Sequence, residues 1–185
     1  IDVTGNYIDI SDIAVTFEKE IPDTVDIAYL CVFNSGEWRA VHWGRIEDGT
    51  ASFTDMGVDI VYLPALYLNE EIVPYGPPFI FHRDGTQTDL RADKDTKVPA
   101  TMRHTANISL TTPAGRTKET PLKPEQEYEL FYWEDGWQSL GKSVADSDAL
   151  MHSEVPSGAL LRLVAQDSDR EERIFTIEDG EQVWW

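Results

Sequence analysis

Short runs in which apolar and polar residues alternate recur along the whole chain, as is typical of half-buried strands. In Ile13–Phe17 the large apolar residues occupy every second position. Ile27–Phe33 is a nearly continuous apolar run with turn residues on both sides. No window of about a dozen residues keeps an apolar stripe at the spacing of a helix. The sequence therefore predicts an all-β fold.

Turn residues separate these runs and predict where the chain reverses. Asp48-Gly49, Asp84-Gly85 and Asp179-Gly180 each favour a tight hairpin, because Asp-Gly accommodates positive φ angles. Pro64 interrupts the apolar run Asp59–Leu68. Since proline cannot donate a ladder hydrogen bond, we expect an edge strand or a bulge there.

The two halves of the chain show similar features in the same order, which predicts two related domains. Phe79-x-Phe81 precedes Asp84-Gly85, as Phe175-x-Ile177 precedes Asp179-Gly180. Between the halves, Arg91–Lys97 contains no large apolar side chain and carries mixed charges, which predicts a linker or an exposed loop. We therefore expect two tandem, mutually similar β-sandwich domains of Ig-like or jelly-roll-like type, spanning residues 1–96 and 97–185.

Composition excludes several classes of function. The 185 residues include 34 acidic and 15 basic side chains, for a net charge of −19. This negative excess repels phosphate, so we expect no nucleic-acid partner. No apolar stretch approaches the roughly 18–20 residues of a membrane-spanning helix, so we expect no membrane span. Cys31 is the only cysteine, which excludes a disulfide framework.

Signatures of catalysis are absent. Cys31 has apolar neighbours in Tyr29–Phe33, which favours a buried strand cysteine over a reactive thiolate. The chain has no Gly-x-Ser-x-Gly elbow and no phosphate-binding glycine loop. No metal-ligand spacing relates the four histidines, which are His42, His82, His104 and His152. We therefore expect no enzymatic activity and assign no catalytic residue.

Acidic segments make calcium the one candidate cofactor. Oxygen-bearing side chains cluster in Asp2–Asp12, Asp146-Ser147-Asp148 and Asp167-Ser168-Asp169. Calcium takes about 6–8 oxygen ligands from flexible loops, but none of these segments matches the twelve-residue calcium loop. Solvated acidic loops are the simpler interpretation. We therefore expect no cofactor other than calcium and assign no metal ligand.

Three aromatic residues are candidates for ligand binding. Trp43 and Trp133 have no aromatic counterpart at the matching place in the other half, and Tyr75 lies in the proline-rich segment Pro74–Pro78. A flat ring beside hydrogen-bonding groups can stack on the C–H face of a sugar, and exposed apolar patches mark binding sites. We predict Trp43, Trp133 and Tyr75 as ligand-binding residues. Core packing of the tryptophans and a rigid proline connector are the alternatives.

Two regions carry a resemblance to a known family. Gly36–Gly44 with Phe53–Pro64, and the ending Glu172–Trp185, resemble the region behind the catalytic core in transglutaminase-like secreted proteins of the Bacteroidetes. In that family, β-sandwich modules follow a papain-like core with a Cys nucleophile, a His and an Asp. The resemblance covers most of this chain but includes nothing of that core. It implies that the chain corresponds to the accessory part alone.

These observations predict a non-catalytic accessory or binding module of a bacterial exported protein, located in the periplasm, on the cell surface or outside the cell. The aromatic candidates favour carbohydrate as the ligand, and a protein ligand and an attached catalytic domain are the other partners we expect. Two alternatives stay open: a structural spacer that docks a transglutaminase-like catalytic domain, and a calcium-dependent adhesion module. A glycosidase would need two facing carboxylates, and nothing in the sequence favours it.

Overall fold

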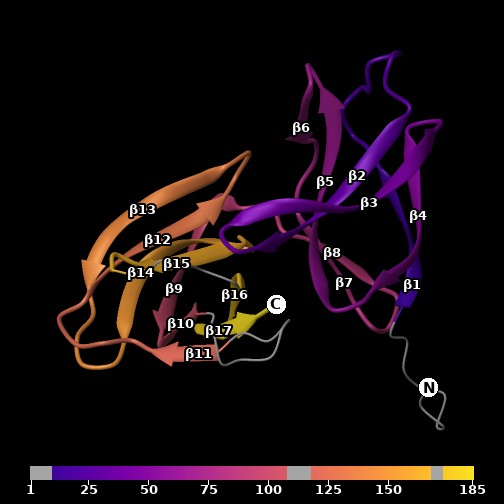
Figure 1. Cartoon of the computed structure of the whole chain (residues 1–185). Helices are drawn as coiled ribbons and strands as arrows, with labels where there is room; N and C mark the ends of the chain where they lie inside the picture. Colours follow the sequence, from indigo (N-terminus) through magenta and orange to yellow (C-terminus); the bar gives the residue numbers. More distant parts are fainter. Residues whose placement is uncertain (1–9, 108–117, 168–172) are drawn as a thin grey trace, which may run out of the picture. The chain divides into compact units, whose positions relative to one another are not determined.

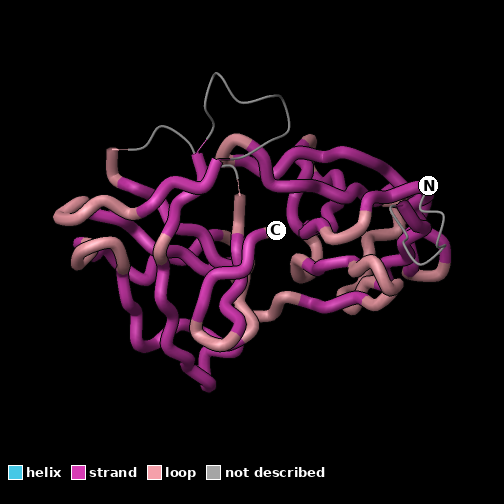
Figure 2. Tube along the Cα trace, turned by 90° about the horizontal axis from the view of Figure 1, so that it is seen from below, coloured by secondary structure: helices cyan, strands magenta, loops and turns pink. Residues whose placement is uncertain are grey.

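The computed structural model describes residues 10–107, 118–167 and 173–185, and every regular element in them is a strand. Figure 2 shows these strands joined by loops and turns. The all-β prediction is confirmed. The described residues include no helix long and apolar enough to cross a membrane. The chain divides into two compact units, of which the first comprises Ile1–Val32 with Trp38–Leu90 and the second Phe33–Glu37 with Arg91–Trp185.

The first unit is built on one sheet with the strand order β1-β4-β3-β2-β5-β7-β8, and β6 also pairs with β5 (Figure 1). Side chains from its distant ends, such as Ile13 of β1 and Phe79 of β7, share one core, so the sheet curls around that core. The strands are β1 Ile10–Thr16, β2 Ile27–Asn34, β3 Glu37–Glu47, β4 Thr50–Gly57, β5 Ile60–Leu68, β6 Glu71–Pro74, β7 Phe79–Phe81 and β8 Gln87–Asp89.

Predicted hairpin turns are present where Asp precedes Gly. Asp48 and Gly49 join β3 to β4 with φ angles of 51° and 76°. Gly85, between β7 and β8, has a φ of 90°. Both positions require the left-handed backbone that Asp and Gly tolerate best.

Pro64 lies inside the sheet, so the prediction of an edge strand is wrong. β5 has β2 on one side, where Leu30 is opposite Pro64. On the other side β7 pairs only as far as Tyr62, and β6 begins its pairing at Ala65. The Pro64 carbonyl faces this junction, because it accepts a hydrogen bond from Tyr75 N at 2.8 Å. The N and C=O of one strand residue point to the same side, so the missing N–H falls where no strand requires it.

The second unit is a seven-stranded sheet with the order β13-β12-β15-β16-β17-β9-β14, beside a separate pair β10-β11. Its end strands β13 and β14 are consecutive in the chain and contact each other, so the sheet nearly closes into a barrel. The strands are β9 Asp93–Met102, β10 His104–Asn107, β11 Lys118–Pro121, β12 Glu127–Trp133, β13 Trp137–Val144, β14 Leu150–Ser157, β15 Leu161–Ala165, β16 Phe175–Glu178 and β17 Glu181–Trp184.

The predicted linker is wrong, because Arg91–Lys97 contains the first half of β9. Residues 93–97 are exposed, but their backbone pairs with β14, with Lys97 opposite Pro156 and Asp93 opposite Ser157. Backbone pairing needs no apolar side chain, which is why the composition of this segment is misleading. The division between the units falls after Leu90, whereas the boundary expected between residues 96 and 97 lies within the strand.

Five strands follow in the same spatial order in both units: β3-β2-β5-β7-β8 in the first and β13-β12-β15-β16-β17 in the second. In addition, β1 pairs antiparallel with β4, as β9 does with β14. Phe79 and Phe175, which we matched in the sequence, lie on the corresponding strands β7 and β16. The mutual similarity of the two halves, and their Ig-like or jelly-roll-like type, stay predictions.

In the second unit, the side chain of Gln182 forms hydrogen bonds with backbone groups of Arg103 and His104, as a neighbouring strand would. The Gln182 Oε1 accepts hydrogen bonds from Arg103 N at 2.7 Å and His104 N at 3.1 Å, and its Nε2 donates to His104 O at 3.0 Å. We expect Gln182→Ala to lower the free energy of unfolding by about 1–2 kcal/mol, because three backbone groups lose their partner. Urea denaturation measures this loss.

Gln166 provides the control for this variant. The exposed side chain of Gln166 makes one hydrogen bond with the described residues, from Nε2 to Val164 O at 3.3 Å. Gln166→Ala should therefore shift the urea midpoint much less than Gln182→Ala. Equal midpoints for the two variants would contradict a structural role for Gln182.

Candidate functional site

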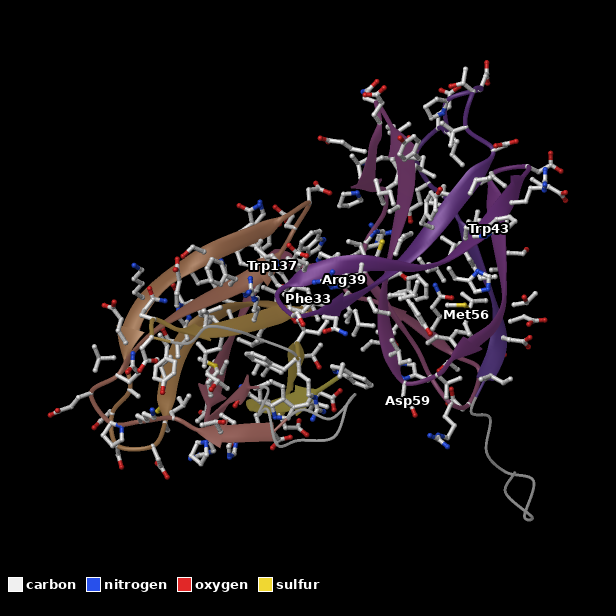
Figure 3. The ribbon with its side chains drawn as sticks, viewed as in Figure 1. Phe33, Arg39, Trp43, Met56, Asp59 and Trp137 are labelled. Atoms are coloured by element: carbon white, nitrogen blue, oxygen red, sulfur yellow. The ribbon has the colours of Figure 1, made fainter. Side chains whose placement is uncertain are left out.

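Alternation along β3 places Trp43 on the outer face of the first unit. Ile46 packs against the core, Gly44 is buried, and the His42 ring meets Phe53 edge-on at 6.3 Å between centroids. Trp43 is at the opposite parity and is 55% exposed. Figure 3 labels Trp43 in the first unit. Its ring is therefore available to a ligand.

The neighbouring strands add further apolar residues to the same face. On β2, Ala28 and Leu30 belong to the core, so Tyr29 between them points outward and is half-buried. On β5, Tyr67 follows the core residue Leu66 and is 51% exposed.

β6 completes this face with Ile72, the exposed cross-strand partner of Tyr67. Ile27 lies two residues before Tyr29 on β2, and exposed Val41 lies two residues before Trp43 on β3, so both point to this face. We call this surface the outer aromatic face, and its residues are Ile27, Tyr29, Val41, Trp43, Tyr67 and Ile72.

The register of the strands brings the aromatic rings together. Ile46 N donates to Asp26 O at 2.8 Å. Trp43 and Tyr29 both point away from the core, so we infer that this register extends to them and that Trp43 is opposite Tyr29. Tyr29 in turn is opposite Ala65 on β5, two residues before Tyr67. With strands about 4.8 Å apart, Trp43 and Tyr67 lie roughly 10–12 Å from each other.

Polar groups beside these rings are uncommitted. Within the described part of the chain, the Trp43 indole N–H and the hydroxyls of Tyr29 and Tyr67 have no hydrogen-bond partner. Arg45, the next outward residue after Trp43, is exposed and forms no ion pair with any described residue. The face therefore offers flat apolar surface together with free donors.

Contacts made by His42 and Gly44, the residues before and after Trp43, fix the backbone at Trp43. Trp43 N donates to His42 Nδ1 at 2.8 Å. At Gly44, a Cβ atom would lie 2.3 Å from Ser52 O and 3.0 Å from the Phe53 ring. Glycine is required there because β3 and β4 approach so closely. Because the residues on either side of Trp43 in the chain are held in place, the direction of its side chain is fixed.

Tyr75 lies away from the outer aromatic face. Its ring packs against the core and against Phe17 at 5.9 Å, with Lys19 Nζ 5.8 Å from its centroid. Its hydroxyl donates to the carbonyl oxygen of Glu20. Tyr75 thus holds the segment that follows β1, and we do not include it in the candidate site.

Trp133 is in the second unit and is only 7% exposed. Its ring meets Trp137 at 5.2 Å with an interplanar angle of 84°. A ring this buried offers no face to a sugar, so Trp133 also lies outside the candidate site. The structure therefore does not bring the three predicted residues together. It adds Tyr67, which the sequence could not distinguish within a run that is apolar on both faces.

Cys31 is buried in β2, and burial raises the pKa of its thiol to about 11. The thiol is therefore protonated at neutral pH, which does not suit a nucleophile. We expect Cys31 to resist alkylation at pH 8 in the native protein and to react after unfolding. Mass spectrometry after iodoacetamide treatment with and without urea measures this, and rapid native labelling would contradict the burial.

The same pKa difference predicts a loss of stability at high pH. The thiol of the unfolded chain ionises near pH 9, whereas that of the folded protein stays protonated up to about pH 11. This contribution is present below pH 9 and is lost as pH rises between those values. We expect about 1 kcal/mol of loss at pH 10 relative to pH 8, measured as the difference between the native protein and Cys31→Ala.

Metal ligands are not assembled within the described residues, where no group of three or more His, Cys, Asp or Glu side chains could hold an ion. Of the acidic segments we considered, residues 2–9 and 168–169 lie outside the described residues. Asp146-Ser147-Asp148 forms a turn in which Asp146 N donates to Ala149 O at 2.9 Å. Calcium binding stays a prediction.

Comparison with known proteins gives no relative: no family model, no curated protein and no solved structure matches this chain.

Proposed function

We propose that the outer aromatic face of the first unit binds carbohydrate and that the protein is a non-catalytic binding module. The observation that carries this proposal is the presence of exposed aromatic rings with uncommitted hydrogen-bonding groups on one sheet face. A sugar ring has an apolar C–H face and a rim of hydroxyls. Trp43 and Tyr67 can stack on the first, while the indole N–H and the phenol hydroxyls reach the second.

The form of the face favours a polymer over a free monosaccharide. The two most exposed rings are roughly 10–12 Å apart on β3 and β5, the two strands that flank β2, and a single sugar ring cannot span this distance. A polysaccharide chain lying across β3, β2 and β5 contacts both rings at once. Binding to both rings then gains from effective concentration, so chain length should raise affinity.

The accessory role rests on the chemistry that the residues supply and on the resemblance described above. Cys31 is buried and protonated, so it does not serve as a nucleophile. We propose that the module belongs to an exported bacterial protein and positions an attached catalytic domain near its substrate. A spacer that docks on that domain is the second candidate, because exposed Val41 and Ile72 suit burial against a protein.

A binding screen with variants tests the carbohydrate proposal. Soluble polysaccharides are assayed by affinity electrophoresis and calorimetry, with calcium and with chelator. We expect Trp43→Ala and Tyr67→Ala each to weaken binding about tenfold, since a stacked ring contributes on the order of 1 kcal/mol or more. Thermal melting should stay unchanged for both variants, because their side chains are exposed.

Met151→Ala is the control, since it removes an exposed apolar side chain from the second unit. This variant should bind polysaccharide like the native protein. Binding that survives both aromatic substitutions would contradict the proposed site. Absence of binding to every polysaccharide would favour the docking role, and binding only with calcium would favour adhesion.

A further inference from the structure

We infer that the outer aromatic face selects acidic polysaccharides, with Arg45 recognising a uronate carboxylate of the sugar that stacks on Trp43. This inference rests on the proposed carbohydrate function and specifies the ligand class of the same site. It comes from the position of one guanidinium group relative to the rings and to the surrounding charges.

Arg45 points to the same side of the sheet as Trp43. Ile46 is opposite Ala51, and both face the core, so the adjacent residues Arg45 and Ser52 point outward. Side chains two residues apart on a strand are about 7 Å from each other. A long arginine side chain can therefore reach the rim of a sugar ring that lies over Trp43.

Among the described residues, no carboxylate pairs with the guanidinium group of Arg45. Along β3 the nearest outward acid is Glu47, and across the strands Arg45 has the uncharged Ile27 and Ser52 beside it. Arg45 forms no ion pair with Glu47 or with any other described residue. An arginine with its donors free can form a bidentate hydrogen-bonded pair with a carboxylate of the ligand.

At the Tyr67 end of the outer aromatic face, the charged side chains are negative. Glu70 and Glu71 are exposed at the β5–β6 hairpin, next to Tyr67 and Ile72. An anionic sugar is therefore repelled near Tyr67, whereas near Trp43 Arg45 attracts it and Glu47 opposes that attraction in part. The face favours a chain that places a uronate at the Trp43 end.

The net charge of −19 does not prevent this contact at physiological salt. Charges farther away than the Debye length of about 8 Å are largely screened at that ionic strength. A guanidinium group in direct contact with a carboxylate is not screened in this way, so the local pair decides the preference. The assay must therefore use about 0.15 M salt.

Polygalacturonate and its fully methyl-esterified form provide a matched pair of ligands, since they share one backbone and differ in carboxylate charge. We expect the native protein to bind the free acid about tenfold more tightly than the ester. Arg45→Gln should reduce affinity for the acid to that for the ester and leave ester binding unchanged. Arg83→Gln removes the same charge from an arginine paired with Asp59 and should change neither affinity.

Three outcomes overturn the inference, and they separate it from the proposed function. If the native protein binds acid and ester equally, Arg45 has no role in selection, while the carbohydrate function stands. The same follows if Arg45→Gln and Arg83→Gln bind the acid equally. Binding of neutral polysaccharides alone also overturns the inference. If Trp43→Ala binds every polymer as the native protein does, the proposed function fails as well.

Discussion

Replacing Phe175 with alanine should lower the free energy of unfolding by about 3–5 kcal/mol, the largest effect that we expect from a single substitution. Phe175 is 0% exposed in the core of the second unit, and its ring meets Trp184 at 5.3 Å with an angle of 61°. The variant loses the transfer free energy of the ring and leaves a cavity that the surrounding strands fill only in part.

Urea denaturation followed by tryptophan fluorescence measures this effect. Phe131→Ala is the matched control, because Phe131 is half-buried on β12 and lies outside that core. The control should lose clearly less stability than Phe175→Ala. A similar loss for both variants would show that Phe175 does not occupy the central position described here.

Gly44→Ala should lower the free energy of unfolding by about 3 kcal/mol, at the upper end of the usual cost of overpacking. The added methyl group would overlap with Ser52 O at 2.3 Å, and a backbone oxygen between paired strands cannot move aside. β3 must then separate from β4, which also turns Trp43 away from its present direction. We therefore expect weaker polysaccharide binding together with a lower melting temperature.

Gly57→Ala tests the reason given for this loss. A Cβ at Gly57 would lie 2.8 Å from Ile60 Cδ1, the end of a flexible side chain that can rotate away. We expect this variant to lose less than about 1 kcal/mol. If calorimetry finds the two glycine variants equally stable, the close approach of β3 and β4 at Gly44 is wrong.

Local signals in the sequence predicted strands such as β1, β2 and β5, but they did not predict β9. Alternation and Asp-Gly pairs located hairpins such as β3–β4, because both signals act within a few residues. β9 was missed because it begins with polar, exposed residues, and its strand conformation depends on pairing with the distant β14. Pro64 was misjudged for a related reason: the partners on its two sides come from separate parts of the chain.

The candidate site was predicted only in part. Trp43 and Trp133 are equivalent as sequence features, but one is exposed and the other is buried against Trp137. Exposure depends on which strands cover a ring, and that is a property of the folded sheet. Tyr67 lies in a run that is apolar on both faces, so no periodicity marked it as the outward residue.

The parallel bridge between Glu181 of β17 and Thr101 of β9 has a consequence for synthesis. β9 and β17 are the first and last strands of the second unit in the chain, so the barrel cannot close until β17 has left the ribosome. Hairpins such as β12–β13 can form earlier, but the β9 edge stays unpaired on that side while translation continues. Charged side chains along its first half, including Asp93, Lys94 and Asp95, then protect that edge from pairing with other nascent chains.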